Sequence, residues 1–139
     1  MTAQTTSGGT WYGMYQKCKD FSGSGTTDIM QSSMIWGSQY DAMLNWILTG
    51  TDKGKVRVNR NGNHSGSKVN TGTTTTDKMN NIYDLEGNLF EWTAEAIYTY
   101  GRVSRGGNYN FSDPASYRGY YNPYNTVSRY SSRVTLYIK

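Results

Sequence analysis

The side chains with the clearest chemical purpose lie in the last third of the chain. Between residues 117 and 130 the sequence places five tyrosines among asparagine, serine, glycine and arginine. Tyrosine offers a large, rigid ring with one polar group, and serine, glycine and asparagine offer adaptable hydrogen bonds; antibody binding loops use the same chemistry. This segment therefore predicts a recognition surface and not a catalytic centre.

Five amino acid types are missing from the same tail. Residues 96–138 contain no Lys, Glu, Gln, Met or Trp, although these types make up 23 of the first 95 residues. They are the types that a codon of the form N-N-C, any base twice and then cytosine, cannot encode. The tail therefore indicates asparagine codons (AAC) that have been randomised at their adenines. The alternative is a tyrosine-rich, lysine-poor edge of a β-sheet.

Residues suited to nucleophilic catalysis are few. The chain has one cysteine, Cys18, and one histidine, His64. A single cysteine excludes an intrachain disulfide and a cysteine-based zinc cluster. His64 lies in a segment of glycine, serine and asparagine with nothing to mark it as a base, so we expect Cys18 to be an inert thiol.

Composition excludes several classes of protein. A chain of 139 residues fits one domain, and 16 glycines with only 17% charged residues indicate a loop-rich β or α+β protein. The net charge is +4, but the basic residues form no run, so nucleic-acid binding is not expected. No apolar run approaches the roughly 20 residues of a membrane span, and no secretion signal begins the sequence. We expect synthesis in the cytoplasm; if the protein works outside a cell, it must leave by lysis, as part of a virion or attached to another molecule.

The clearest secondary structure is a helix that begins near Ser38. Ser38 followed by Asp41 is typical of a helix start with a capping box, and Gly50 is a plausible end. The apolar stripe has the i, i+3, i+4, i+7 spacing of one helix face: Tyr40, Met43, Leu44 and Ile47. We expect this stripe to pack in the core.

Other segments are shorter or irregular. Residues 1–10 are expected to be a flexible lead-in, Trp11–Tyr15 a first strand, and residues 51–77 a long exposed loop, because almost no apolar residue occurs there. Alternating polar and apolar residues predict three later strands: Leu89–Thr93, Arg102–Tyr109 and Ser132–Ile138. Phe90 and Trp92 are expected in the core, and Arg105 and Arg133 are expected to tie loops by hydrogen bonds.

Three motifs resemble the formylglycine-generating-enzyme (sulfatase-modifying factor) superfamily. Asn81–Thr93 is similar to its Gly-Asn-Val-Trp-Glu-Trp signature, Arg102–Tyr109 to its Arg-Val-x-Arg-Gly-Gly-Ser-Trp, and Ser132–Val134 to its closing Gly-Phe-Arg. The resemblance covers roughly residues 33–138. It implies an α+β, C-type-lectin-like fold, with a mixed, mostly antiparallel sheet, one or two helices and long loops, in a single domain over residues 11–139.

The resemblance also bears on cofactors. In the enzyme branch, a structural calcium ion is held by the positions that match Asp84, Gly87, Leu89 and Glu91, so the resemblance implies that calcium can bind here although no cofactor is required. The alternative is a hairpin, turning at Gly87, with two surface acids. The enzyme's oxidase reaction needs a cysteine pair that holds copper in the C-terminal region. No cysteine follows Cys18, so the resemblance implies fold without catalysis.

The lost enzyme motif and the N-N-C tail together resemble the variable proteins of diversity-generating retroelements, in which reverse transcription at template adenines rewrites the end of a C-type-lectin-like domain. The resemblance implies a variable region over about residues 108–131. Arg118, Pro123 and Arg133 are expected to be fixed. The diversified positions are expected to cluster on one exposed face: Asn110, Tyr117, Gly119, Tyr120, Tyr121, Asn122, Tyr124, Asn125, Val127, Ser128, Arg129 and Tyr130.

The expected function is non-catalytic binding of an unidentified protein or other surface receptor, by a protein carried on a phage tail or a bacterial surface. The oligomeric state stays open. Three alternatives remain: a carbohydrate-binding, lectin-like domain, an enzyme with residual activity, and a purely structural part of a fibre or capsid.

Overall fold

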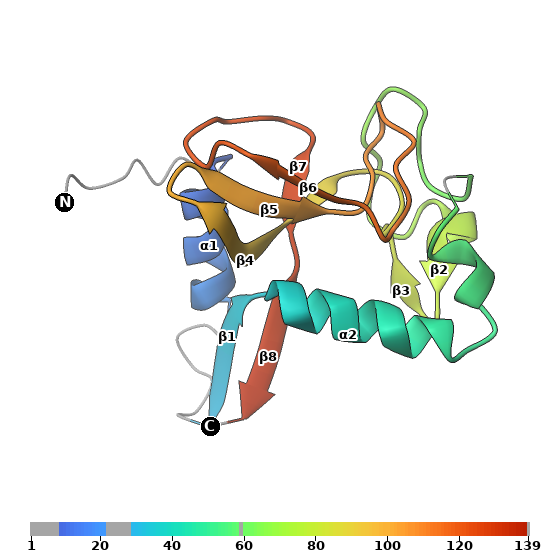
Figure 1. Cartoon of the computed structure of the whole chain (residues 1–139), viewed down its shortest axis with the longest axis horizontal. Helices are drawn as coiled ribbons and strands as arrows, with labels where there is room; N and C mark the ends of the chain where they lie inside the picture. Colours follow the sequence, from blue (N-terminus) through green and yellow to red (C-terminus); the bar gives the residue numbers. More distant parts are fainter. Residues whose placement is uncertain (1–8, 22–28, 59, 139) are drawn as a thin grey trace.

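A four-stranded sheet forms the centre of the molecule (Figure 1). The computed structural model describes residues 9–21, 29–58 and 60–138. The strand order in the sheet is β6-β5-β4-β7, and these strands are β4 (Phe90–Tyr98), β5 (Gly101–Arg105), β6 (Arg118–Tyr121) and β7 (Tyr130–Ser132). The β4–β5 and β5–β6 pairs are antiparallel, whereas β4 and β7 run parallel.

Two small ribbons and two helices surround this sheet. One ribbon pairs β1 (Met30–Met34) with β8 (Val134–Ile138), and the other pairs β2 (Lys78–Met79) with β3 (Ile82–Tyr83); both are antiparallel. The helices are α1 (Trp11–Asp20) and α2 (Gly37–Leu48), and two short 3-10 turns are η1 (Lys53–Lys55) and η2 (Thr75–Asp77). This mixed, mostly antiparallel arrangement confirms the predicted α+β class. No helix in the described ranges is long and apolar enough to cross a membrane.

The segment predicted as a first strand is helix α1, so that prediction is wrong. The Thr10 side chain caps the helix by accepting a hydrogen bond from the Gly13 N–H at 3.1 Å. Trp11 and Cys18, which lie two turns apart, are both buried against the sheet. The helical spacing was therefore present in the sequence, but the aromatic residues favoured a strand. Residues 1–8 of the expected lead-in lie outside the described residues, and Thr10 is buried.

Helix α2 confirms the second helix prediction, although its start differs. Tyr40, Leu44 and Ile47 are buried, as the apolar stripe predicts. The helix begins after Trp36, whose backbone N–H donates to the Gln39 side-chain oxygen at 2.9 Å. The expected cap from Ser38 and Asp41 is therefore wrong.

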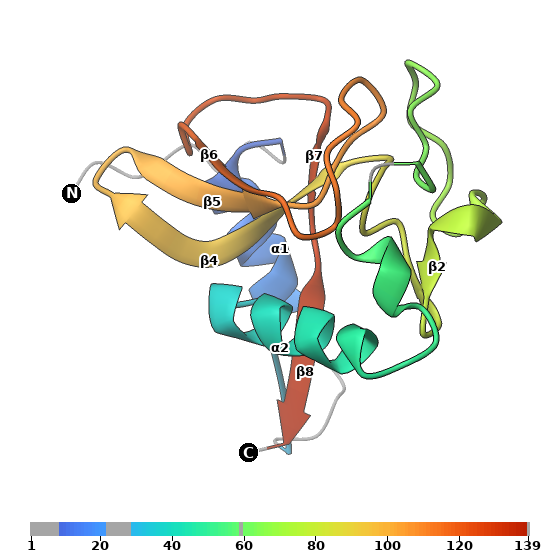
Figure 2. The same cartoon turned by 45° about the vertical axis from the view of Figure 1, so that its right-hand side comes forward.

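Residues 51–77 are largely irregular, but they are not exposed throughout. Val56, Asn63 and Asp77 are buried. Figure 2 shows the segment around residues 60–70 next to that around residues 108–113, and the Gly66 N–H donates to the Tyr109 carbonyl at 2.9 Å. The expectation of a wholly exposed loop is therefore corrected: backbone hydrogen bonds and buried polar side chains hold this segment, where the sequence offered almost no apolar residue.

The core consists of two hydrophobic clusters, and only the second contains side chains of the four-stranded sheet. The first lies under α2 and is formed by Ile35, Tyr40, Leu44, Ile47, Val56, Met79, Leu85 and Ala115. The second lies under α1 and is formed by Trp11, Cys18, Met34, Phe90, Trp92 and Tyr130. Phe90 and Trp92 are 7% and 1% exposed, which confirms their predicted place in the core.

Candidate binding surface

The predicted variable segment forms one edge of the central sheet and a loop above it. Residues 118–121 are the edge strand β6, residues 122–129 form the loop, and Tyr130 begins β7. Figures 1 and 2 both show this loop running across the top of the sheet before it descends into β7. The segment therefore presents an edge strand and an arched loop to solvent.

Most of the predicted positions reach the surface. The exposed members are Asn110, Tyr117, Tyr120, Asn122, Tyr124, Asn125 and Ser128, and the half-buried members are Gly119, Tyr121, Val127 and Arg129. We call these eleven residues the tail surface. Their exposure agrees with a recognition surface, whereas ligand binding by any of them stays a prediction.

Tyr130 does not belong to this surface, so its expected exposure is wrong. Its side chain is 8% exposed and stacks on Trp92, with ring centroids 4.4 Å apart. The parallel pairing of β7 with β4 places Tyr130 opposite Phe90, inside the second cluster. Burial raises the pKa of its hydroxyl. This long-range pairing is invisible in the local sequence.

The outer tyrosines rest on this buried aromatic layer. Tyr117 stacks on Phe90 with centroids 5.9 Å apart, and Tyr121 stacks on Tyr130 at 5.7 Å. Offset-stacked rings at such distances attract each other beyond their buried area. Tyr117 and Tyr121 therefore rest on rings that the core holds in place.

Strand β6 presents its side chains alternately to the two sides of the sheet, so the expectation of one face is wrong. Tyr121 pairs with Arg102, whose guanidinium lies over the Trp11 ring on the α1 side. The neighbouring Tyr120 must point to the α2 side, because successive side chains of a strand alternate. There it meets Tyr98 edge to face at 5.6 Å, and a hydrogen bond between their hydroxyls raises the pKa of Tyr98.

Residues outside the predicted set shape the loop. The Trp11 N–H donates to the carbonyl of buried Pro123 at 3.2 Å, and the Tyr12 ring lies 5.4 Å from the Tyr124 ring. Burial and a hydrogen bond with Tyr124 both raise the pKa of Tyr12. Helix α1 therefore supports the tail surface, although it is about a hundred residues away in the sequence.

Four exposed apolar residues near this surface escaped the sequence prediction: Ile97, Tyr98, Tyr100 and Phe111, with exposures of 40%, 51%, 65% and 51%. The first three lie at the tip of the β4–β5 hairpin. The change in composition at residue 96 could have found them, because it begins before the motif that bounded the prediction. Arg129 lies over the Phe111 ring, 5.6 Å from its centroid.

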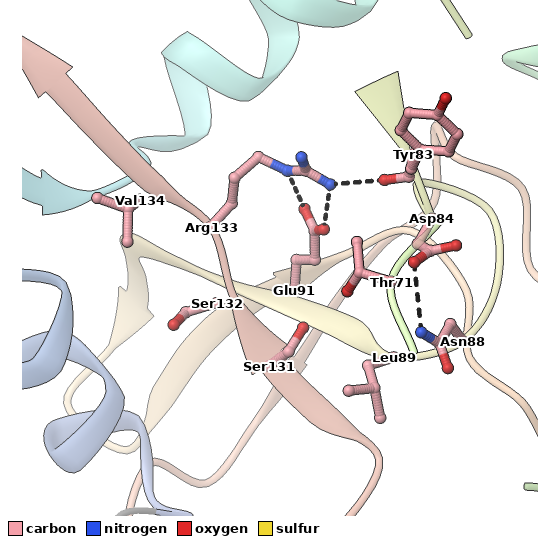
Figure 3. Close-up of a pocket in the computed structure, with 10 residues that line it drawn as sticks. All are labelled: Thr71, Tyr83, Asp84, Asn88, Leu89, Glu91, Ser131, Ser132, Arg133 and Val134. Atoms are coloured by element: carbon pink, nitrogen blue, oxygen red, sulfur yellow. Dashed lines mark hydrogen bonds and ion pairs between the residues drawn. The ribbon is translucent and has the colours of Figure 1, made fainter. Parts of the chain in front are cut away.

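Three of the four residues implied for calcium, Asp84, Leu89 and Glu91, line a cavity of about 260 Å³, shown in Figure 3. Arg133 donates to both Glu91 oxygens, with Nε 2.9 Å from Oε2, and its other nitrogen reaches the Tyr83 carbonyl at 3.0 Å. The charge of Glu91 holds the pKa of Arg133 above its usual range. Arg133 therefore ties segments together, as predicted, and already neutralises Glu91.

The remaining members of that set do not complete a calcium site. Asp84 Oδ2 accepts from the Gly72 N–H at 3.1 Å, and only Asp84 Oδ1 is buried without a partner. Gly87 packs against the backbone of the 60–67 segment, and Leu89 lines the cavity. Within the described ranges no three His, Cys, Asp or Glu residues are placed to hold a metal. An ion held by Glu91 would have to displace the Arg133 guanidinium, so the residues as placed do not fit calcium without that rearrangement.

The alternative of a hairpin with two surface acids is also wrong. Asp84 and Glu91 are each 6% exposed. Strand β3 pairs with β2, whereas β4 pairs with β5 and β7, so the turn at Gly87 joins two different sheets. The sequence suggested a hairpin because a turn separates two short alternating segments, but pairing across a sheet is decided by distant strands.

A buried polar network connects this turn to the 60–77 segment. Asp77 accepts hydrogen bonds from the N–H groups of Glu86 and Gly87, at 3.1 and 2.9 Å, and burial raises the pKa of Asp77 to about 6. The Glu86 carboxylate accepts from the backbone and side-chain nitrogens of Asn61, at 2.7 and 3.0 Å. His64 Nδ1 lies 3.0 Å from the Asn108 carbonyl. We call Asn61, His64, Asp77, Glu86 and Gly87 the polar junction.

The residues with nucleophilic or acid–base chemistry are used in the structure itself. His64 belongs to the polar junction, with Nε2 3.6 Å from Glu86 Oε1. The Cys18 thiol is 2% exposed, lies 3.2 Å from the Ser132 hydroxyl, and has its pKa raised by burial. A raised pKa lowers the thiolate fraction, and the thiolate is the reactive form. These positions agree with the expected inert thiol.

No protein-family model and no curated protein matches the chain. Among solved structures, the chain is similar to Treponema denticola variable protein 1, with a TM-score of 0.63 and 15% identity over 92% of this chain and 69% of that one. It is also similar to CarF, with a TM-score of 0.53 and 14% identity over 78% of this chain and 48% of that one. The first similarity confirms, for the fold, the resemblance to variable proteins that motifs and composition indicated.

Proposed function

We propose that this protein is a non-catalytic ligand-binding protein with a C-type-lectin-like fold, whose tail surface is diversified by a retroelement. The ligand is a protein or another surface receptor, and the protein is displayed on a phage tail or a bacterial surface. The observation that carries the proposal is the separation of two aromatic layers. The rings of Tyr117, Tyr120 and Tyr124 are 38%, 56% and 42% exposed, while Phe90 and Trp92 in the core are 7% and 1% exposed.

This separation suits a surface that must change without unfolding. Substitutions at exposed positions usually alter stability by less than about 0.5 kcal/mol, whereas loss of a buried aromatic ring costs about 3–5 kcal/mol. A diversified position must belong to the first class in every copy of the protein. Eleven of the twelve predicted positions are exposed or half-buried.

A library test needs no ligand. We would randomise the tail-surface positions with N-N-C codons, display the library, and select for resistance to protease. Most variants are expected to survive. In matched libraries randomised at Phe90, Trp92 and Tyr130, most variants are expected to be cleaved by the protease, because those rings fill the second cluster. If the tail-surface library and the core libraries lost equal fractions of their variants, the surface could not be a diversified one. The tail tyrosines would then be part of the structural scaffold.

The genetic part of the proposal has its own test. The genome that carries this chain should contain a near-identical copy of the DNA for about residues 108–131 that differs at adenines, next to a reverse-transcriptase gene. Its absence would reject retroelement diversification even if the library survived. A ligand screen with surface proteins and glycans would then separate receptor binding from the lectin-like alternative, since exposed tyrosine rings can also stack on sugars.

A further inference from the structure

A second concave site lies on the α2 side of the sheet. It is a groove of about 440 Å³ between α2, the residues that follow η1 and the start of β6. The rings of Tyr117 and Tyr121 pack on the opposite side, in the aromatic cluster under α1. Small-molecule sites typically measure about 300–1,000 Å³, so the groove has room for a small ligand.

The floor of the groove is aliphatic. Leu44, Leu48 and Val56 line it, and Leu44 and Val56 are also members of the first hydrophobic cluster. Leu48 is half-buried. Aliphatic carbon at the bottom of a concave site favours a ligand that brings an apolar part of its own.

The walls of the groove are cationic. Arg57, Arg105 and Arg118 line it, with Asp41 as the acidic residue. Arg105 pairs with Asp41, and Arg118 pairs with Glu95. Arg57 is exposed and makes no ion pair with a described residue. The groove therefore keeps one guanidinium without an acidic counterpart.

Arg105 adds a second unused donor. Its side chain is 4% exposed, and its Nε–H has no hydrogen-bond partner in the described part of the chain. A buried donor left without an acceptor costs about 1–3 kcal/mol, so native proteins rarely keep one unless water or a ligand completes it. The face of the Arg105 guanidinium is already used, because it stacks 4.8 Å from the Tyr40 ring centroid.

We propose that this groove binds a monocarboxylate with a short aliphatic body. The carboxylate accepts hydrogen bonds from the exposed Arg57 and, after a shift of the buried Arg105 side chain, from its Nε–H, and the body covers Leu48. The planar guanidinium fork matches the two oxygens of a carboxylate. A compact inorganic anion would leave the aliphatic floor uncovered. This site does not depend on diversification of the tail.

Three probes separate the contribution of the carboxylate charge from that of the aliphatic body. Hexanoate has both the charge and the aliphatic body, acetate has the charge alone, and hexanamide has the body without the charge. Each would be titrated into the ¹⁵N-labelled full chain, with the backbone amides and the Arg105 Nε–H observed by NMR. Hexanoate is expected to give saturable shifts in the millimolar range, and acetate and hexanamide should bind at least about tenfold more weakly, because each loses one of two contributions.

Two matched variants locate the binding. Arg57→Gln should weaken hexanoate binding about tenfold, because it removes a charge-assisted pair. Arg60→Gln removes an exposed arginine that does not line the groove and should leave the affinity unchanged. Leu48→Asn should weaken hexanoate but not acetate.

Several outcomes would overturn the proposal. Two such outcomes are the absence of any shift of a groove signal by hexanoate and equal binding of hexanoate by the Arg57→Gln and Arg60→Gln variants. Equal binding of hexanamide would mean an apolar groove without carboxylate recognition, and equal binding of inorganic phosphate would mean a charge site without an apolar part. A melting curve of each variant would show that it is folded before its affinity is compared.

Discussion

The tail surface and the polar junction are both rich in polar residues and poor in long regular elements, yet the structure uses them in opposite ways. Most tail-surface side chains reach solvent, and Tyr117 and Tyr121 stack on buried rings. Polar-junction side chains point inward, and Asp77 and Glu86 are 0% exposed. A polar sequence therefore has two meanings: a surface free to change, or a buried network in which each group needs its partner.

Within the tail, the strongest test of this contrast compares two tyrosines. Tyr130→Ala should destabilise the protein by about 3 kcal/mol, because it empties a ring site against Trp92 and Phe90. Tyr120→Ala should change stability by about 0.5 kcal/mol or less, because that ring is 56% exposed. Urea unfolding of both variants would measure the difference. Equal losses would mean that the tail is scaffold throughout.

The polar junction should be intolerant of even one methyl group at Gly87. A Cβ there would lie 2.2 Å from the backbone nitrogen of Asn63, and backbone cannot move aside cheaply. Gly87→Ala is expected to cost about 3 kcal/mol. Gly54→Ala is the matched control, because nothing lies within 4 Å of its added Cβ. Equal changes in melting temperature for Gly87→Ala and Gly54→Ala would refute the close approach of the two backbones.

Asp77 should make the polar junction sensitive to pH in an unusual direction. Its folded-state pKa is raised from 3.8 to about 6, mainly by burial. The folded state therefore holds a proton that the unfolded state releases, and this contribution to stability is full below about pH 4 and lost as the pH rises through 6.

Asp77→Asn tests that linkage. The difference in unfolding free energy between the original chain and this variant should change by about 2 kcal/mol between pH 4 and pH 7, with the original chain relatively more stable at pH 4. Asp52→Asn is a control, because hydrogen bonding from the Asn80 N–H lowers the pKa of Asp52 and gives the opposite slope. Parallel curves for Asp77→Asn and the original chain would contradict a raised pKa.

A smaller effect would show whether helix α1 contributes to the tail surface. Tyr12→Phe removes the hydroxyl that bonds with Tyr124 and keeps the ring. Stability should fall by about 0.5 kcal/mol, because both hydroxyls remain close to water. The amide signals of residues 122–126 should broaden or shift in NMR spectra, while those of the polar junction stay in place. Unchanged loop signals would mean that α1 does not shape the loop.

The smallest expected effect is that of calcium. Glu91 is neutralised by Arg133, so melts in millimolar calcium and in excess chelator should coincide. A site filled at a hundredfold excess over its Kd would instead raise stability by about 2.7 kcal/mol. Such a rise, if Asp84→Asn abolished it, would establish the calcium site that the resemblance implies.

The sequence alone was sufficient for features written in short-range patterns. The stripe from Tyr40 to Ile47 predicted α2, and alternation predicted the strand that carries Phe90 and Trp92. Composition predicted an exposed, tyrosine-rich tail, and the exposures of Tyr117, Tyr120 and Tyr124 agree with it. Helical and strand periodicities are local properties, so neighbouring residues are enough to reveal them.

Only the tertiary structure decided which similar residues lie inside and which lie outside. Tyr120 and Tyr130 occur in similar local sequence, but β7 pairs with β4 and buries the second. Asp77 and Glu86 look like surface acids until the 60–67 backbone packs against Gly87. Helix α1 supports a loop that lies about a hundred residues away. In each case the deciding contact joins distant segments, and burial depends on those contacts rather than on residue type.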